Sequence, residues 1–158
     1  VYQIHTDLLG SPVLDDVFDA HGAYLLPVAY AEGCPICPAY PAGHATIAGA
    51  CVTVLKAFFD PAHVLAAPVE VDPVSDATAL IPYSGSATLT VGGELNKLAS
   101  NIATGRSLAG VNYRSDATQG MLLGEQVAIR LLRDLLRTYN ETPGAITFAG
   151  FNGTSITL

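Results

Sequence analysis

Residues 34–59 read CPICPAYPAGHATIAGACVTVLKAFF, a proline-rich loop that leads directly into an apolar segment. Prolines at positions 35, 38 and 41 exclude regular helix from the loop, because proline lacks an N–H and holds the residue before it in extended backbone. From His44 to Phe59, small and apolar residues occupy nearly every helical position, which predicts a helix that is buried on all sides and ends at Asp60-Pro61. Such a helix favours a helical bundle as the fold.

The rest of the chain predicts three more helices and a few short strands. Apolar spacing indicates helices within 13–30, over 94–108 and over 117–139, the last of them capped by Asp116. Short β-prone runs lie at 68–71 and 87–91, which favour one hairpin, and at 145–148 and 154–158. The expected fold is therefore mainly α, one domain over residues 1–158 with helices packed as a bundle and small peripheral strands.

Composition indicates a chain that buries part of its surface against other protein. Only 13% of the residues are charged and the mean hydropathy is +0.39, so we expect a subunit or a fragment of a larger body. The net charge is −7 with seven Lys and Arg residues and no basic run, which argues against nucleic-acid partners. No apolar run approaches the roughly 20 residues of a bilayer-spanning helix. Because the chain starts at Val1, we expect a processed or truncated start.

The three cysteines allow at most one disulfide within the chain. Cys34 and Cys37 form a C-x-x-C, but no second C-x-x-C and no H-x-x-x-H completes a zinc site, so we expect no metal held by cysteine. The surrounding prolines are unlike a thioredoxin-type motif. The favoured interpretation is a disulfide or two plain thiols in a loop, and the redox state of Cys34, Cys37 and Cys51 stays open, as does the compartment.

Polar residues worth a chemical explanation gather at two junctions between loop and helix. Gly43 and His44 begin one predicted helix, while Arg106, Asn112 and Asp116 surround the break between two others. A helix N-terminus offers free N–H groups to an anion, His44 can donate or accept a proton beside it, and Arg106 can supply a bidentate charge. If both junctions face one pocket, that pocket binds a tetrahedral oxyanion.

Several separated blocks then resemble one known family. In order along the chain, these blocks are AYPAGHAT at 39–46, GELNKLA at 93–99, GR at 105–106, YRSD at 113–116 and GMLLGE at 120–125. They are similar to the C-terminal catalytic half of the vanadium-dependent haloperoxidases. That family belongs with the type 2 phosphatidic acid phosphatases. The resemblance implies the helical bundle of that family. It also implies a vanadate cofactor and the oxidation of halide, bromide above all, by hydrogen peroxide to a hypohalous acid.

The resemblance assigns roles to four residues. His44 matches the acid–base histidine, Gly43 matches a backbone donor to the oxyanion, and Arg106 matches one of the arginines that bind its equatorial oxygens. Asp116 matches the carboxylate that orients the metal-bound imidazole. His5, His21 and His63 match no motif, and we expect them to be surface or packing residues.

Other positions depart from the family pattern. Asn112 stands where the family has its metal-ligating histidine, and an amide nitrogen is a very poor ligand, so vanadate binding is expected to be weak or absent. Ala42 replaces a serine of the oxyanion cage, and Cys37 replaces a histidine thought to tune halide choice. Lys56 and Lys97 both lie outside the family's first cage motif, a lysine and an arginine on an earlier helix.

Three functions stay open at this point. The first is a haloperoxidase subunit or fragment whose missing cage residues come from an upstream segment or another chain, acting on halide and hydrogen peroxide in a homo-oligomer or with that partner. The second is a catalytically silent assembly subunit, because Asn112 removes the ligand. The third is an acid phosphatase, which would need a histidine nucleophile where Asn112 stands.

Overall fold

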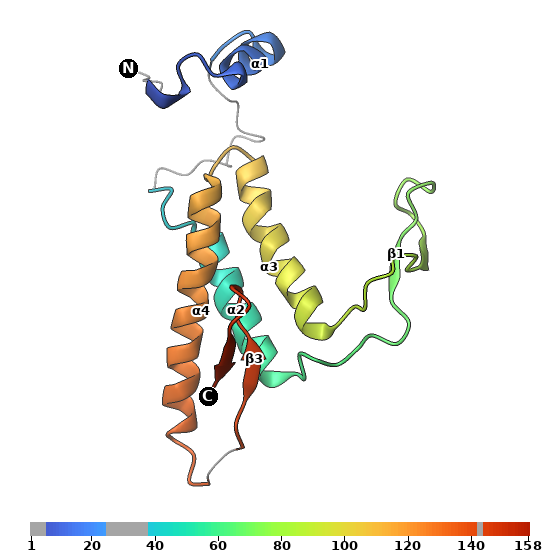
Figure 1. Cartoon of the computed structure of the whole chain (residues 1–158), viewed down its shortest axis with the longest axis vertical. Helices are drawn as coiled ribbons and strands as arrows, with labels where there is room; N and C mark the ends of the chain where they lie inside the picture. Colours follow the sequence, from blue (N-terminus) through green and yellow to red (C-terminus); the bar gives the residue numbers. More distant parts are fainter. Residues whose placement is uncertain (1–5, 25–37, 142–143) are drawn as a thin grey trace.

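Three long helices form the body of the protein (Figure 1). The computed structural model describes residues 6–24, 38–141 and 144–158. In the bundle, α2 (Gly43–Phe58) packs against α3 (Val91–Leu108) and most extensively against α4 (Arg114–Leu136). Because α2 and α4 run in the same direction and α3 in the opposite one, the starts of α2 and α4 lie beside the end of α3 (Figure 1). The fold is thus the mainly α bundle that the sequence predicts.

The close packing of α2 on α4 depends on glycine. A Cβ atom at Gly120 would lie 2.9 Å from the carbonyl oxygen of Ala42 and 3.0 Å from Cβ of Ala45. A Cβ atom at Gly124 would overlap the backbone of α2 at Thr46, and one at Gly49 would overlap the backbone of α4. The two helices therefore meet backbone to backbone at these positions, which places the first turn of α2 firmly on α4.

Two antiparallel hairpins accompany the bundle. In the first, β1 (Val69–Val71) pairs with β2 (Leu80–Pro82), and Figure 1 shows it projecting away from the helices. The sequence predicts one hairpin here, but with 87–91 as the second strand, which is wrong: Thr90 makes only a single bridge, and α3 begins at the next residue. In the second hairpin, β3 (Thr147–Ala149) pairs with β4 (Ser155–Thr157), in line with the predicted strands of the tail.

The helix bounds differ from the predicted ones where side chains cap the helices. Near the N-terminus, the 3₁₀ helix Thr6–Leu8 precedes α1 (Pro12–His21), which is shorter than the predicted segment and has no buried residue. α3 begins earlier than Glu94, because the Thr90 hydroxyl oxygen accepts a hydrogen bond from Gly93 N–H at 3.2 Å. α4 begins at Arg114, because Asp116 is its third residue and accepts from a backbone N–H one turn back. No helix in the described ranges is long and apolar enough to cross a membrane.

The prediction that the helix after His44 is buried on all sides is wrong for the described part of the chain. α2 is buried where it meets α3 and α4, at positions such as Ala45, Ala48 and Val52. Its remaining face is open, with Ile47 exposed to 66% and Phe58 to 79%. The apolar surface of α2 is therefore larger than the area that residues 6–24, 38–141 and 144–158 cover.

Candidate functional site

A cluster of buried alanines brings the two polar junctions to the same end of the bundle. Ala42 and Ala45 flank the start of α2, Ala103 lies one turn before the end of α3, and Ala117 lies in the first turn of α4. All four are nearly inaccessible, and Met121 packs against them. Their small side chains let the three helix ends approach closely, so the residues beside them share one region.

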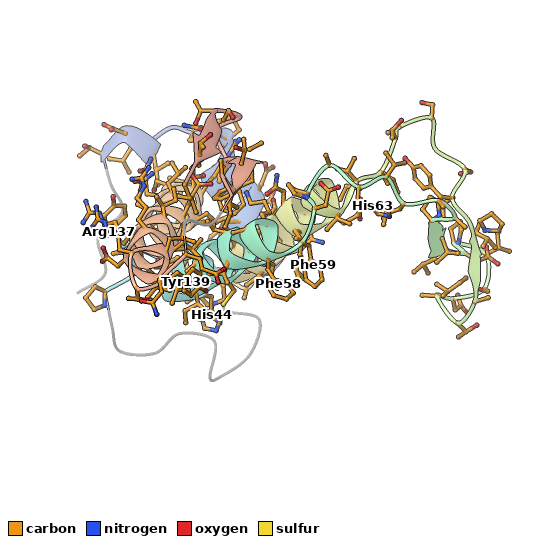
Figure 2. All side chains as sticks on the ribbon, turned by 90° about the horizontal axis from the view of Figure 1, so that it is seen from below. His44, Phe58, Phe59, His63, Arg137 and Tyr139 are labelled. Carbon is orange, nitrogen blue, oxygen red and sulfur yellow. The ribbon has the colours of Figure 1, made fainter. Side chains whose placement is uncertain are left out.

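Gly43 and His44 form the open first turn of α2. Both are exposed, and a Cβ atom added at Gly43 would meet nothing within 4 Å. The N–H of Thr46 donates to Ala42 O at 2.9 Å and begins the hydrogen bonds within the helix, so the N–H groups of Gly43, His44 and Ala45 have no acceptor within α2 itself. Figure 2 shows His44 and Phe58 on the same side of the α2 ribbon. A helix N-terminus with no side chain at its first residue and an imidazole at its second can accept an anion.

Ala42 contributes backbone groups and no hydroxyl. Its side chain is buried in the alanine cluster, its N–H donates to Asp116 O at 3.3 Å, and its carbonyl also accepts the Thr46 hydroxyl at 3.1 Å. Ala42 therefore fixes the start of α2, and the sequence-based expectation that it lines the oxyanion cage stays a prediction. Cys37 lies outside the described residues.

Arg106 lies in the last turn of α3, half-buried, on the segment that leads to Asn112. The chain turns back immediately after it: Ala109 N–H donates to Gly105 O at 3.0 Å and Val111 N–H donates to Arg106 O at 3.1 Å. Gly110 allows this reversal with φ +78°. The backbone of Arg106 and the position of Asn112 are thereby fixed relative to each other.

The Asn112 side chain is engaged with the loop in front of α2. Its Nδ2 donates to Ala39 O at 2.8 Å, a contact between residues 73 positions apart in the sequence. An amide nitrogen lacks a free lone pair for a metal, and here its N–H group also has an acceptor. Asn112 therefore does not fit the role of a covalent vanadium ligand.

Asp116 has a structural partner of its own. The carboxylate is buried, accepts from Tyr113 N–H at 2.9 Å through Oδ2, and accepts the Ser115 hydroxyl at 3.3 Å through Oδ1. These bonds stabilise the N-terminus of α4, where a negative charge also complements the helix dipole. The sequence predicts Asp116 as the residue before the helix, whereas the structure places it three residues after the N-cap Tyr113, where its carboxylate closes a capping box.

A second polar cluster lies farther along the bundle. Lys56, exposed to 1%, donates through Nζ to Ala149 O at 2.9 Å and to Asn96 Oδ1 at 3.1 Å, and lies 3.9 Å from the carboxylate of Glu125. Burial lowers the pKa of Lys56, and the Glu125 charge opposes that shift. The one signal of this cluster in the sequence is Lys56 itself, a single charged side chain in an otherwise apolar helix.

The remaining sequence-based expectations concern metals, histidines and cysteines. Among the described residues, no group of three or more His, Cys, Asp or Glu side chains could hold a metal ion. His21 and His63 are exposed, and His63 lies on the connection between α2 and β1, well away from His44 (Figure 2). Cys51 is a free, exposed thiol on α2, while Cys34 and His5 lie outside the described ranges.

Comparison with known proteins identifies relatives of the whole bundle. The family described as the VCPO second helical-bundle domain matches residues 19–141. The chain is 50% identical over 140 residues to a vanadium-dependent bromoperoxidase of Corallina pilulifera and 46% identical over 145 residues to one of Ascophyllum nodosum. These matches cover 89% and 85% of the chain, but only 23% and 24% of the relatives.

A solved structure shows the same fold. It is the homohexameric second vanadate-dependent bromoperoxidase of Ascophyllum nodosum, which superposes with a TM-score of 0.84 at 33% sequence identity. The match covers 100% of this chain and 32% of that one. Fold, sequence and family match agree, and the chain belongs to the vanadium-dependent haloperoxidase family, within its second helical bundle.

Proposed function

We propose that this chain is the part of a vanadate-dependent haloperoxidase that presents Gly43, His44 and Arg106 to an oxyanion. The enzyme would oxidise halide, bromide above all, with hydrogen peroxide to a hypohalous acid. The observation that carries the proposal is the alanine cluster, which brings the start of α2 and the end of α3 together. Because the chain spans about a quarter of its bromoperoxidase relatives, we propose the activity for an assembly that includes the rest of the fold.

Each of the three residues has a distinct task in this proposal. The open first turn of α2 at Gly43 donates N–H groups to the oxyanion, and Arg106 neutralises its charge with fixed, charge-assisted hydrogen bonds. His44 holds or releases a proton at the edge of the site. Vanadate, when bound, would supply the Lewis acid that activates hydrogen peroxide, and the peroxide is the oxidant. Since Asn112 does not fit the ligand role, we propose that hydrogen bonds and charge alone hold vanadate, with correspondingly weak affinity.

The open face of the bundle supports the need for a partner. We define the apolar stripe as two rows of exposed side chains at helical spacing: Ile47, Cys51, Val54 and Phe58 on α2, and Leu123, Val127, Leu131 and Leu135 on α4. Between the rows lies a groove of about 380 Å³ that is almost free of polar surface. On α2 the row continues to His44 at the same spacing, so a helix that covers the stripe also reaches the site.

We assign the apolar stripe to a helix from the part of the haloperoxidase fold outside residues 1–158. Such a helix can bring further cationic groups to the site, in addition to Arg106. Leu131→Asp on the stripe should weaken association with that part, whereas Leu80→Asp, at a similarly exposed site on the projecting hairpin, should not. Equal effects of the two variants, or concentration-dependent self-association that only Leu131→Asp abolishes, would count against this assignment; the latter would point to a second copy.

Bromide oxidation tests the proposed activity. The native assembly is assayed with hydrogen peroxide before and after loading with vanadate, using His44→Ala and, as the matched control, His63→Ala. We expect turnover only with vanadate, a loss of about 10²-fold or more in His44→Ala, and no change in His63→Ala. Absence of turnover in a folded, vanadate-loaded assembly would reject the proposal.

One observation favours a second candidate, a silent assembly subunit. The amide of Asn112 is engaged with Ala39 and the carboxylate of Asp116 caps α4, so neither is arranged around a metal-bound imidazole. A silent subunit predicts that the assembly forms normally, with no halide oxidation and no vanadate-inhibited phosphoester hydrolysis. The assay of halide oxidation therefore separates the silent subunit from a haloperoxidase, and an assay of phosphoester hydrolysis separates it from a phosphatase.

A further inference from the structure

We infer that Asn112 acts as a latch that positions His44 relative to Arg106, by fastening the loop in front of α2 to the junction between α3 and α4. The positional part of this inference stands on the contacts of the chain. Its consequence for oxyanion binding rests on the proposed function. Asn112 is on this view a positioning residue, because it acts on the site through the backbone of Ala39.

Two hydrogen bonds hold the loop. Asn112 Nδ2 donates to Ala39 O at 2.8 Å, and Ala42 N–H donates to Asp116 O at 3.3 Å. The first bond comes from a side chain on the segment that joins α3 to α4, and the second is a backbone bond to the first turn of α4. The four residues 39–42 are thus held at both ends, and His44 follows two residues later.

The latch also connects His44 and Arg106, the two side chains that would contact the proposed oxyanion. Arg106 lies in the last turn of α3, and the turn that follows the helix is fixed by the bond from Val111 N–H to Arg106 O at 3.1 Å. Asn112 comes directly after this turn. A short and well-bonded path therefore runs from Arg106 through Asn112 to Ala39 and on to His44. Without the Asn112 bond, Ala42 keeps its bond to Asp116 O and its close contact with Gly120 of α4, but residues 39–41 lose their tie to the junction. The loop in front of His44 is then held at one end only, and the path from Arg106 to His44 is loosened on that side.

The amide of Asn112 suits this role better than the side chain of aspartate, alanine or histidine would. A carboxylate of the same shape offers no donor at neutral pH and would place negative charge against the Ala39 carbonyl. Alanine removes the donor and leaves that carbonyl without this partner. A neutral histidine has one N–H donor, and its bulkier ring needs more room than the amide occupies. Asparagine at this position therefore holds the loop through its bond to Ala39 O. A side chain that bound a metal here would not be available for that bond, and the loop would depend on its other contacts.

Hydrogen–deuterium exchange and vanadate binding test the inference in the native assembly. The variants are Asn112→Ala and Asn112→Asp, with Asn101→Ala, at an exposed position on α3, as the matched control. We expect exchange of the peptide containing Ala42 to speed up about fivefold in both Asn112 variants, the effect of one hydrogen bond, with no change in the control. Vanadate affinity, measured by equilibrium dialysis, should fall by a similar factor in Asn112→Ala while the melting temperature stays within a few degrees.

The outcomes separate the latch from the proposed function. Unchanged exchange around Ala42 in both variants would overturn the latch. A loss of vanadate binding of 10³-fold or more in Asn112→Ala with unchanged exchange would also overturn it, since that pattern identifies a direct ligand. Faster exchange in an assembly that binds no vanadate even in its wild-type form would support the latch and reject the proposed function.

Discussion

The buried Lys56 offers the sharpest test of how this bundle is held together. Its ammonium group has two hydrogen-bond acceptors, Ala149 O and Asn96 Oδ1, and the ring of Phe151 lies 4.3 Å away at its centroid. Glu125, exposed to 2%, accepts from Phe151 N–H at 2.8 Å. Lys56 and Glu125 together therefore fasten the C-terminal hairpin to α2 and α4.

Replacing Lys56 with methionine keeps most of the side-chain volume and removes the charge. Glu125 then remains buried without its cation, a situation that costs about 3–5 kcal/mol in proteins. The value expected here is the lower one, about 3 kcal/mol, because the two charges are 3.9 Å apart and Glu125 keeps its bond to Phe151. For a domain of this size, that corresponds to a melting temperature about 6–12 °C lower.

Lys97 provides the control, since it is the other lysine of the chain. Lys97 pairs with Glu94 at 2.6 Å on the surface of α3, where solvent screens the interaction. In thermal and urea unfolding, Lys56→Met should lose much of its stability and Lys97→Met should change little. The double variant Lys56→Met/Glu125→Leu should recover part of the stability that Lys56→Met loses. Similar stability of the two single variants would refute the reasoning, as would a double variant that is less stable than Lys56→Met.

The pH dependence of stability provides a second measurement on the same residue. The pKa of Lys56 is lowered in the folded chain from its ordinary value of 10.5, chiefly by burial. Between the lowered pKa and 10.5 the unfolded chain binds more protons than the folded one, so this group makes the free energy of unfolding rise with pH. The difference in unfolding free energy between wild type and Lys56→Met should therefore increase as the pH is raised through that interval, and a decrease would contradict the assignment.

Three further predictions concern the helix contact and the site. Gly124→Ala should lower the free energy of unfolding by about 1–3 kcal/mol in urea unfolding, because the added methyl group overlaps the backbone of α2; a neutral effect would argue against so close an approach. Asn112→His should raise vanadate affinity in an assembly that contains the rest of the cage, measured by equilibrium dialysis, since an imidazole can ligate the metal; no gain would argue against the placement of the site. Arg106→Ala should weaken vanadate binding by about tenfold or more, measured in the same way, because a charge-assisted contact is lost; equal affinity would remove Arg106 from the site.

Much of the bundle could be predicted from the sequence, because the relevant signals are local. The prolines before Gly43 and Asp60-Pro61 bracket α2 almost to the residue, and the strands of the tail follow from their β-prone runs. The partner of β1 could not be found in this way, since strand pairing depends on tertiary packing and 87–91 is as β-prone as 80–82. The exposed face of α2 was missed because an apolar surface looks the same in sequence whatever covers it.

The candidate site could be predicted only in part from the sequence. The blocks that resemble the family predict that Gly43, His44 and Arg106 share one site; the alanine cluster brings together the helix ends that carry them, and their roles stay a prediction. The hydrogen bond from Asn112 to Ala39 joins residues 73 positions apart, and no local sequence pattern predicts a contact over that separation. Lys56 could have been noticed, because a lone charge in an apolar helix usually has a buried partner.

The backbone contact between α2 and α4 bears on how this chain can change over time. Gly120 and Gly124 carry no reactive group, yet any side chain at either position meets the opposite helix. His44, by contrast, is exposed and does not belong to the buried alanine cluster. Sequence drift among descendants of this chain should therefore be slowest at these silent glycines, and chemistry can be lost or regained at the helix ends while the scaffold that carries it stays the same.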